Sequence, residues 1–189
     1  MEINKETPWN PIKQDTKKGK LRNYPYPSLI NYGAFPQTWE DPAHRERGLD
    51  LQGDNDPLDV LELGTAKLRK TGDVYAVKVL GALAMVDGGE MDWKIVTVAV
   101  DDPLAAQVDD LRQTLSNDME ERLTKIREWF RDYKIPDGKP PNEFAFDGRY
   151  LSKDVAVEVV ESQTRLWRNL VSRERTENDE LWWTKKTFQ

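Results

Sequence analysis

Two runs of apolar and β-branched residues flank a pair of glycines near the middle of the chain. Residues 74–86 read VYAVKVLGALAMV and residues 93–100 read WKIVTVAV, with Gly88 and Gly89 between them. Such runs, joined by a short segment that contains glycine, are typical of two strands paired as a hairpin. Gly81 interrupts the first run and predicts a bend or bulge in that strand. We therefore expect a β-sheet at the centre of the fold.

The rest of the chain divides at about residue 102 into a β-rich part and a helical part. Residues 1–102 are rich in glycine, proline and short strand-like runs, such as Val60–Leu63, which ends at Gly64. Several short strands with turn signals favour a small closed or nearly closed barrel. Residues 103–171 have a helical pattern. The fold class that we expect is mainly β with flanking α-helices (α+β), in a single domain over residues 1–189.

Two helices are expected after the strands. Pro103, preceded by two aspartates, is a typical helix start, and we expect that helix to continue until just before Pro136. Its apolar stripe comprises Val108, Leu111, Leu115, Met119, Leu123, Ile126, Trp129 and Phe130. A second stripe comprises Val157, Val160, Thr164, Trp167 and Val171. The tail, residues 172–189, is polar, and we expect it to be either frayed or docked through Trp182 and Trp183.

Composition excludes several classes of function. The 189 residues suit one domain, and the net charge of -6 leaves no basic surplus for nucleic acid. No run approaches about 18 apolar residues, so no membrane span is expected. The start of the chain is polar and lacks a signal-peptide pattern, which favours a cytoplasmic location. The absence of cysteine and the presence of a single histidine, His44, argue against zinc sites and Ser-His-Asp triads.

The segment GDNDPLD, residues 53–59, places Asp54, Asp56 and Asp59 within six residues. Like charges held close together raise one another's pKa and destabilise a fold unless a cation neutralises them, and hard divalent cations prefer such oxygen ligands. If the segment is extended, the first two aspartates point to one face. A solvated acidic turn is the alternative. An EF-hand is excluded, because position six is Asp59 rather than glycine and position twelve is Thr65 rather than glutamate.

A second acidic segment, residues 87–94, reads DGGEMDWK and contributes Asp87, Asp92 and Lys94. Two acidic segments at loop ends suggest an oxygen-rich site for more than one metal ion. Basic candidates to hold an anion beside it are residues 17–20 (KKGK), Arg22, Lys94, Tyr133 and Lys134. A solvated turn and a helix C-cap are the alternatives for the first and last of these. Mg²⁺ with arginine, lysine and tyrosine fits phosphoryl transfer to water.

These segments together resemble the soluble family I inorganic pyrophosphatases, in particular their eukaryotic-type branch. The resemblance covers residues 2 to 171. It is carried by PWNPIKQDTKKGKLR (8–22), NYGAFPQTWEDP (31–42), GDNDPLDVLELG (53–64), KVLGALAMVDGGEMDWK (78–94) and WFRDYKIPDGKPPNEFAF (129–146). It implies a small OB-like β-barrel with flanking helices, and Mg²⁺-dependent hydrolysis of pyrophosphate to two phosphates.

The resemblance also implies a role for individual residues. The implied metal ligands are Asp54, Asp59 and Asp92, with Asp87 for a further ion and Glu2 in the position of a metal-bridging glutamate. Asp56 would orient and deprotonate the attacking water. The implied phosphate-binding residues are Arg22, Lys94, Tyr133 and Lys134, with Tyr32 supporting the site. Several Mg²⁺ ions, or Mn²⁺ and other divalent metals in their place, and a homodimer are expected with this assignment.

The chain departs from the family pattern in three places. Family members carry further sequence upstream of Met1, and either a truncated gene record or a naturally shortened paralogue would explain the difference. The segment between Arg22 and Asn31 is shorter, and Ser28 stands where a tyrosine is expected, for which Tyr24 or Tyr26 would substitute. The tail after residue 171 does not match. The alternatives to pyrophosphate hydrolysis are therefore action on an organic diphosphate, such as a prenyl diphosphate, and a non-catalytic metal-binding paralogue.

Overall fold

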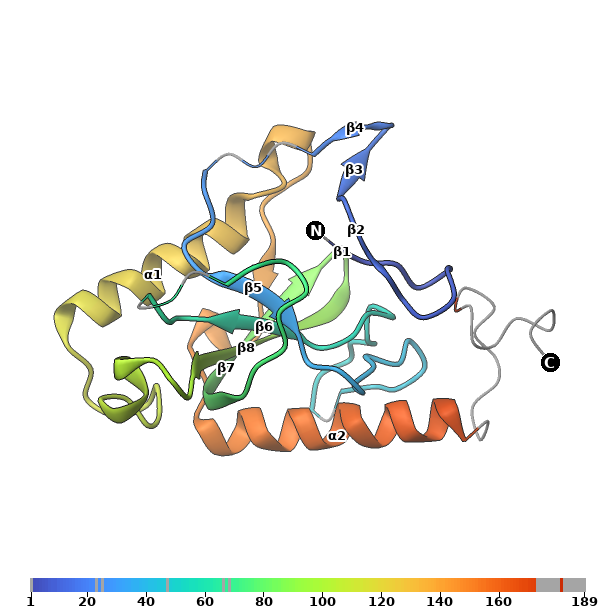
Figure 1. The fold of residues 1–189 in the computed structure, drawn as a ribbon. Coiled ribbons are helices and arrows are strands. Elements are labelled where there is room, and N and C mark those ends of the chain that lie inside the picture. The colour runs from blue at the N-terminus through green and yellow to red at the C-terminus, as the bar shows by residue number, and fades with distance from the viewer. Residues whose placement is uncertain are drawn as a thin grey trace.

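The computed structural model describes residues 2–22, 24, 26–46, 48–65, 67, 69–172 and 181. Its main feature is a five-stranded sheet with the strand order β5-β6-β8-β7-β9. The strands of this sheet are β5 (Asn31–Ala34), β6 (Asp59–Glu62), β7 (Val77–Asp87), β8 (Glu90–Ala99) and β9 (Glu143–Phe144). Two small antiparallel ribbons precede it, β1 (Glu2–Ile3) with β2 (Ile12–Lys13) and β3 (Thr16–Lys17) with β4 (Lys20–Leu21). The β3–β4 ribbon projects away from the sheet (Figure 1).

The central hairpin forms as the sequence predicts. Strands β7 and β8 pair from Asp87↔Glu90 to Val77↔Ala99, and the register shifts between Val79 and Gly81. A Cβ atom at Gly81 would lie 2.4 Å from the carbonyl oxygen of Leu151, so glycine is required where the segment at Leu151 approaches β7. The expected hairpin and the expected bulge are both confirmed.

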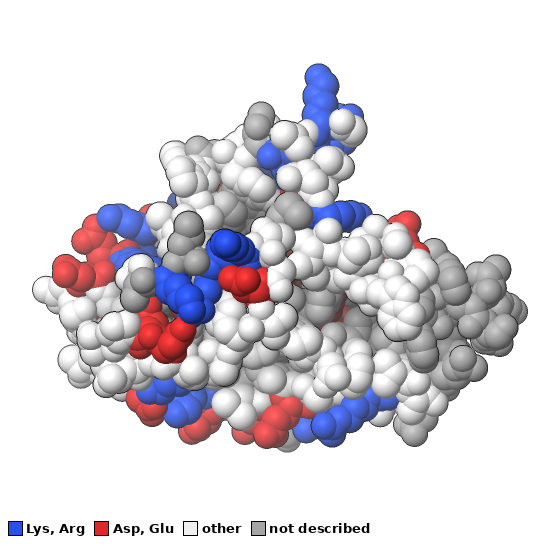
Figure 2. Space-filling model, viewed as in Figure 1, with Lys and Arg blue, Asp and Glu red and all other residues white. Residues whose placement is uncertain are grey.

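The two α-helices cover opposite faces of the sheet. Helix α1 (Asn117–Asp132) contributes four buried side chains to a core that also contains Val96 and Val98 of β8. Helix α2 (Lys153–Val171) packs through Ala156 and Val159 against a second core that contains the alternate β8 residues Trp93 and Ile95. Successive side chains of a strand point to opposite faces, so β8 supplies both cores. Figure 1 shows α2 running along the full width of the sheet, and Figure 2 shows acidic and basic side chains alternating along its outer surface.

The first predicted helix is shorter than expected. Pro103 opens a single 3-10 turn, η1 (Pro103–Ala106), and α1 begins at Asn117, with the hydroxyl of Ser116 accepting a hydrogen bond from the backbone N–H of Met119. The prediction of one helix from residue 103 was therefore wrong over residues 107–116, where the chain turns. Val108 and Leu111 are nevertheless buried in the core, so their apolar spacing reflects burial rather than a helix. Two further 3-10 turns are η2 (Ile135–Asp137) and η3 (Phe146–Gly148).

The mainly β fold with flanking helices is confirmed. Within the described residues the main sheet is open, with β5 and β9 at its edges, and the two ribbons form separate sheets. Leu181 is buried with Trp39 and Leu170, whereas Trp182 and Trp183 lie outside the described residues. Neither described α-helix combines the length and apolarity that crossing a bilayer requires.

Candidate metal and phosphate site

The candidate site lies on the face of the sheet that α1 covers, at the end next to the β7–β8 turn. Asp92 and Lys94 alternate along β8 with Trp93 and Ile95, and so point to the same face as Val96 and Val98. The ring of Phe130 on α1 lies 5.4 Å from the ammonium of Lys94. One face of the strand therefore continues from an apolar core into a polar, charged cluster.

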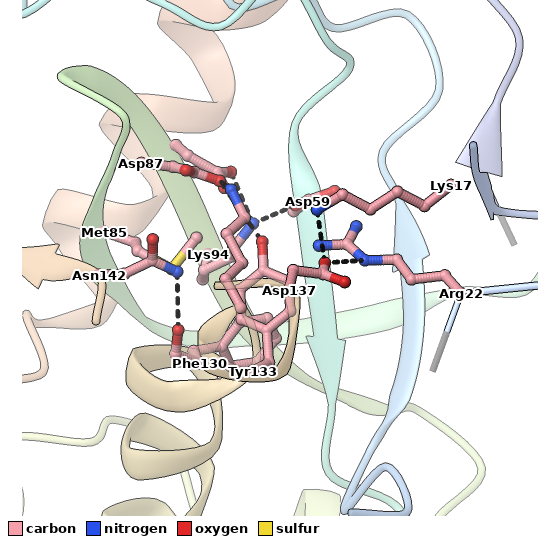
Figure 3. Close-up of polar contacts among 12 residues, drawn as sticks. Lys17, Arg22, Asp59, Met85, Asp87, Lys94, Phe130, Tyr133, Asp137 and Asn142 are labelled. Atoms are coloured by element: carbon pink, nitrogen blue, oxygen red, sulfur yellow. Dashed lines mark hydrogen bonds and ion pairs between the residues drawn. The ribbon is translucent and has the colours of Figure 1, made fainter. Parts of the chain in front are cut away.

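Lys94 joins the two acidic segments. Its Nζ lies 2.6 Å from Oδ1 of Asp92 and also contacts the carboxylate of Asp59 (Figure 3). Asp59 is within reach because β6 and β8 pair in parallel with Asp59 opposite Lys94. Burial opposes the charge on Lys94, but the carboxylates of Asp59 and Asp92 raise its pKa above the usual range. The hydroxyl of Tyr32 on β5 donates a second hydrogen bond to Asp59.

The C-terminal end of α1 provides a second ion pair. Lys134, just after the helix, contacts the carboxylate of Asp87 at the end of β7. The hydroxyl of Tyr133 donates to the same carboxylate over 3.4 Å. Asp87 therefore contacts Tyr133 and Lys134, and Figure 3 shows Asp87 and Tyr133 near Lys94.

The loop of residues 53–59 bends, so the condition of an extended segment is not met. Asn55 has a φ of 69°, and the N–H of Asp56 donates to Oδ1 of Asp54 over 2.9 Å. Glu40 holds the loop through its backbone: its N–H donates to the carbonyl of Asp56, and its carbonyl accepts from the N–H of Asn55, each over 2.9 Å. Within the described part of the chain, Glu40, Asp54 and Asp92 form a group whose carboxylate oxygens lie within 4.8 Å of one another.

This group has the chemistry of a hard-cation site. All three residues offer carboxylate oxygens, which Mg²⁺ and similar ions prefer. Burial and the charges of Asp54 and Asp92 raise the pKa of Glu40. Burial and the charge of Asp56 raise the pKa of Asp54 to about 7. A divalent cation would remove this repulsion, so the residues present fit a metal ion.

The raised pKa of Asp54 predicts an inverse dependence of stability on pH in the metal-free protein. The carboxyl has a pKa of about 7 in the folded chain against 3.8 in the unfolded one, so the native state binds more protons between these values. Stability must then fall as the pH rises through this window. We expect the unfolding temperature in EDTA to fall between pH 5 and pH 8 and the Asp54→Asn variant to show a smaller fall. If the unfolding temperature of the wild type does not fall more steeply than that of Asp54→Asn over this pH range, the assignment is contradicted.

Asp56 is not a member of the three-carboxylate group. Its Oδ1 lies 2.9 Å from Nζ of Lys5, which comes from the turn between β1 and β2, and its side chain is 47% exposed. The exposed carboxylate of Asp56 therefore forms an ion pair with Lys5, although its charge also acts on Asp54.

Arg22 is held between acidic and aromatic groups at the base of the β3–β4 ribbon. Its guanidinium lies 3.4 Å from each of Asp15 and Asp137, and Lys17 lies 2.7 Å from Asp137 (Figure 3). The rings of Tyr24 and Tyr133 lie 5.3 Å and 5.2 Å from its Cζ atom. Basic side chains extend from here to the tip of the ribbon (Figure 2).

The remaining predicted residues have separate surroundings. Asp15 lies next to Glu2, and burial with this neighbour raises the pKa of Glu2. Glu2, Asp59 and Asp87 thus lie outside the closest carboxylate group within the described residues. Tyr24 donates to Asp15 over 2.5 Å and stacks on Trp129, while the hydroxyl of Ser28 donates to the carbonyl of Ile30. Of the two expected tyrosine substitutes, Tyr24 is the one that lies beside Arg22.

Sequence reasoning missed four residues that the structure brings to this region, namely Lys5, Asp15, Glu40 and Asp137. Three of them have partners far away in the chain, whereas Asp15 contacts Arg22 and Tyr24, seven and nine residues further on. Glu40 had one local signal, since it directly follows Trp39, a large aromatic residue that favours burial of the segment. The other three depend on tertiary contacts.

Comparison with known proteins gives a consistent result. The family model for inorganic pyrophosphatase matches residues 1–168. Soluble inorganic pyrophosphatase 1, chloroplastic, of Chlamydomonas reinhardtii is 46% identical over 181 residues, which are 96% of this chain and 64% of that protein. The inorganic pyrophosphatase structure from Schistosoma japonicum superimposes with a TM-score of 0.86 at 44% identity and covers 91% of this chain and 62% of that one.

A third match is a vacuolar soluble pyrophosphatase of Trypanosoma cruzi, which was solved without its N-terminal domain and in complex with PPi. It has a TM-score of 0.82 at 41% identity, over 92% of this chain and 65% of that one. The chain belongs to the inorganic pyrophosphatase family. It spans less than two thirds of the length of each of these three relatives. The resemblance to this family, from which we expected an OB-like fold, is thereby confirmed.

Proposed function

We propose that this protein hydrolyses inorganic pyrophosphate to two phosphates with Mg²⁺ as cofactor. The observation that supports this most is the joining of the two acidic segments by Lys94, which contacts both Asp59 and Asp92. Carboxylates that hold cations beside ammonium and guanidinium groups suit a small polyanion. Family membership supports the same substrate, and the Trypanosoma cruzi relative was solved with PPi.

The carboxylates would hold the metal ions. Asp54, Asp59 and Asp92 are the proposed ligands of the central ions, and Asp87 and Glu2 are the proposed ligands of further ones. When bound, the metal supplies Lewis acidity that polarises the phosphates and acidifies a water molecule.

Asp56 is the proposed general base. Water adds to one phosphorus, its proton passes to the Asp56 carboxylate, and the bond from that phosphorus to the bridging oxygen breaks. The leaving phosphate departs with the bridging oxygen and its electron pair. Arg22, Lys94, Tyr133 and Lys134 would donate hydrogen bonds to the phosphate oxygens and offset the charge that builds up on them, with Tyr32 orienting Asp59. The ammonium groups that now contact Asp59, Asp87 and Asp92 would become available as metal ions replace them.

The direct test is a comparison of substrates. Purified protein is assayed for phosphate release from pyrophosphate and from a prenyl diphosphate, with Mg²⁺ and with EDTA. We expect Mg²⁺-dependent release from pyrophosphate and a strong preference for it. Preference for the prenyl diphosphate would instead support an organic diphosphatase, and no release from either would support a non-catalytic paralogue. A homodimer and a cytoplasmic location stay predictions, which light scattering and fractionation would check.

Lys5 should compete with metal ions for the acidic loop. Its ammonium contacts Asp56 over 2.9 Å, and both side chains are partly exposed, so the pair contributes little stability of its own. We expect Lys5→Met to bind Mg²⁺ about two- to fivefold more tightly than wild type, as measured by thermal unfolding over a Mg²⁺ titration. Lys125→Met is the matched control, because it removes the same charge from a surface pair with Glu121. Equal Mg²⁺ midpoints for the two variants would contradict the competition.

A further inference from the structure

Glu40 is a buried acid at the centre of the candidate site. The residue is 1% exposed, and its Oε1 accepts a hydrogen bond from the backbone N–H of Trp93 over 3.0 Å. Its other oxygen, Oε2, is buried and has no hydrogen-bond partner among the described residues. A buried carboxylate oxygen without a partner is costly, because it has lost its hydration and gained nothing in exchange. The Oε2 atom of Glu40 therefore has no bonding partner among the described residues.

The backbone prevents Glu40 from moving away from this position. Its N–H and carbonyl are both hydrogen-bonded to the acidic loop, at Asp56 and Asn55. The loop also packs directly on it, since a Cβ atom at Gly53 would lie 2.4 Å from the carbonyl carbon of Glu40. Through Trp93 the same residue is tied to β8, next to Asp92. Glu40 thus connects the two acidic segments through hydrogen bonds, as Lys94 does through ion pairs.

The charges around Glu40 call for a cation. Its carboxylate lies within 4.8 Å of those of Asp54 and Asp92, and Lys94 is already shared between Asp92 and Asp59. Among the described residues, no lysine or arginine forms an ion pair with Glu40 or Asp54. Ligand oxygens on opposite sides of a Mg²⁺ ion are about 4.2 Å apart, given bond lengths of about 2.1 Å. A small inward movement would therefore bring all three carboxylates onto one ion.

We propose that Glu40 is a metal ligand, and that Glu40, Asp54 and Asp92 bind one divalent cation between them. Glu40 is the inner ligand, fixed by Trp93, and Asp54 is the ligand that faces the loop. A structural role alone would leave Oε2 without a partner. The inference rests on the proposed function for the use of the ion in catalysis, but the binding of the ion is independent of any substrate.

The test measures Mn²⁺ binding by electron paramagnetic resonance in the absence of pyrophosphate. Glu40→Gln keeps the shape of the side chain and the acceptor for Trp93 but removes the charge. We expect its Mn²⁺ affinity to be at least about tenfold weaker than that of wild type. Glu62→Gln is the matched control: Glu62 is also 1% exposed, but its oxygens accept hydrogen bonds from Asn31, Gly64 and Ala99. We expect this control to lose stability and to keep its Mn²⁺ affinity.

A crystal structure of the Mn²⁺-loaded wild type separates a ligand from a residue that acts through its neighbours. The inference requires an oxygen of Glu40 within bonding distance of an ion, at about 2.2 Å. The inference is overturned if the ion lies near Glu40 without a bond to either of its carboxylate oxygens. It is also overturned if Glu40→Gln binds Mn²⁺ as tightly as wild type. If that variant does not fold, Glu40→Asp, which retains the charge on a shorter side chain, should also bind Mn²⁺ more weakly. Mn²⁺ binding without phosphate release would contradict the proposed function and leave this inference standing.

Discussion

Asp56→Asn is expected to lower Mg²⁺-dependent pyrophosphate hydrolysis roughly 10²- to 10⁴-fold, the usual contribution of a general base. The structure separates this residue from the closest carboxylate group. Asp56 is half exposed and meets Lys5, whereas Asp54 lies with Glu40 and Asp92. The side chain of asparagine has nearly the same shape as that of aspartate, but its amide cannot accept a proton near neutral pH. The rate is measured as phosphate release at saturating Mg²⁺.

Two controls separate loss of the base from loss of the site. Asp50→Asn removes a more exposed carboxylate, 89% against 47% for Asp56, that pairs with Arg45, and its rate should equal that of wild type. Asp56→Asn itself should still bind Mn²⁺ and unfold at nearly the wild-type temperature. Hydrolysis within about threefold of wild type would rule out Asp56 as the base, since even a weak general base contributes more.

Lys94→Met is expected to have the largest effect on the stability of the metal-free protein. Lys94 is buried and its ammonium is shared by two carboxylates. Its removal leaves these charges buried and unneutralised, which costs about 3–5 kcal/mol in free energy of unfolding. For a chain of this length the unfolding temperature should fall by on the order of 10 °C. Calorimetry in EDTA measures this change.

Added Mg²⁺ should then restore much of the lost stability, because the ion replaces the missing positive charge beside Asp59 and Asp92. The increase in unfolding temperature on adding Mg²⁺ should therefore be larger in Lys94→Met than in wild type. Lys125→Met, which breaks a surface pair, should change the free energy of unfolding by less than about 1 kcal/mol. A variant that is destabilised equally with and without Mg²⁺ would show that Lys94 acts through packing and not through charge.

The parts of the fold that could be predicted from the sequence are those set by local patterns. The β7–β8 hairpin follows from two strand-like runs and the glycines between them, and its register then places Lys94 on the same face as Asp92. Helix α2 was predicted, but its buried face is formed by Ala156, Val159, Gln163 and Leu170, not by the predicted stripe, in which Val157 is exposed. The start of α1 was mispredicted because Val108 and Leu111 are buried from a turning segment, and the stronger signal was the N-cap at Ser116.

The parts that could not be predicted depend on contacts between distant segments. The parallel pairing of β6 with β8 brings Asp59 to Lys94 across 35 residues of sequence, and no local pattern specifies this register. The positions of Glu40 and Lys5 depend on how the acidic loop bends at Asn55. The motif therefore predicted a set of acids, and tertiary structure decided which of them lie together.

The central claim is that carboxylates from the two acidic segments hold divalent cations in common. The most direct test is a crystal of the protein soaked in Mn²⁺, with anomalous difference density measured at the manganese absorption edge. The account predicts at least one peak between the loop of residues 53–59 and strand β8, within bonding distance of Asp54 and Asp92. A map that shows manganese elsewhere on the surface, with these two carboxylates bonded to no ion, would contradict it.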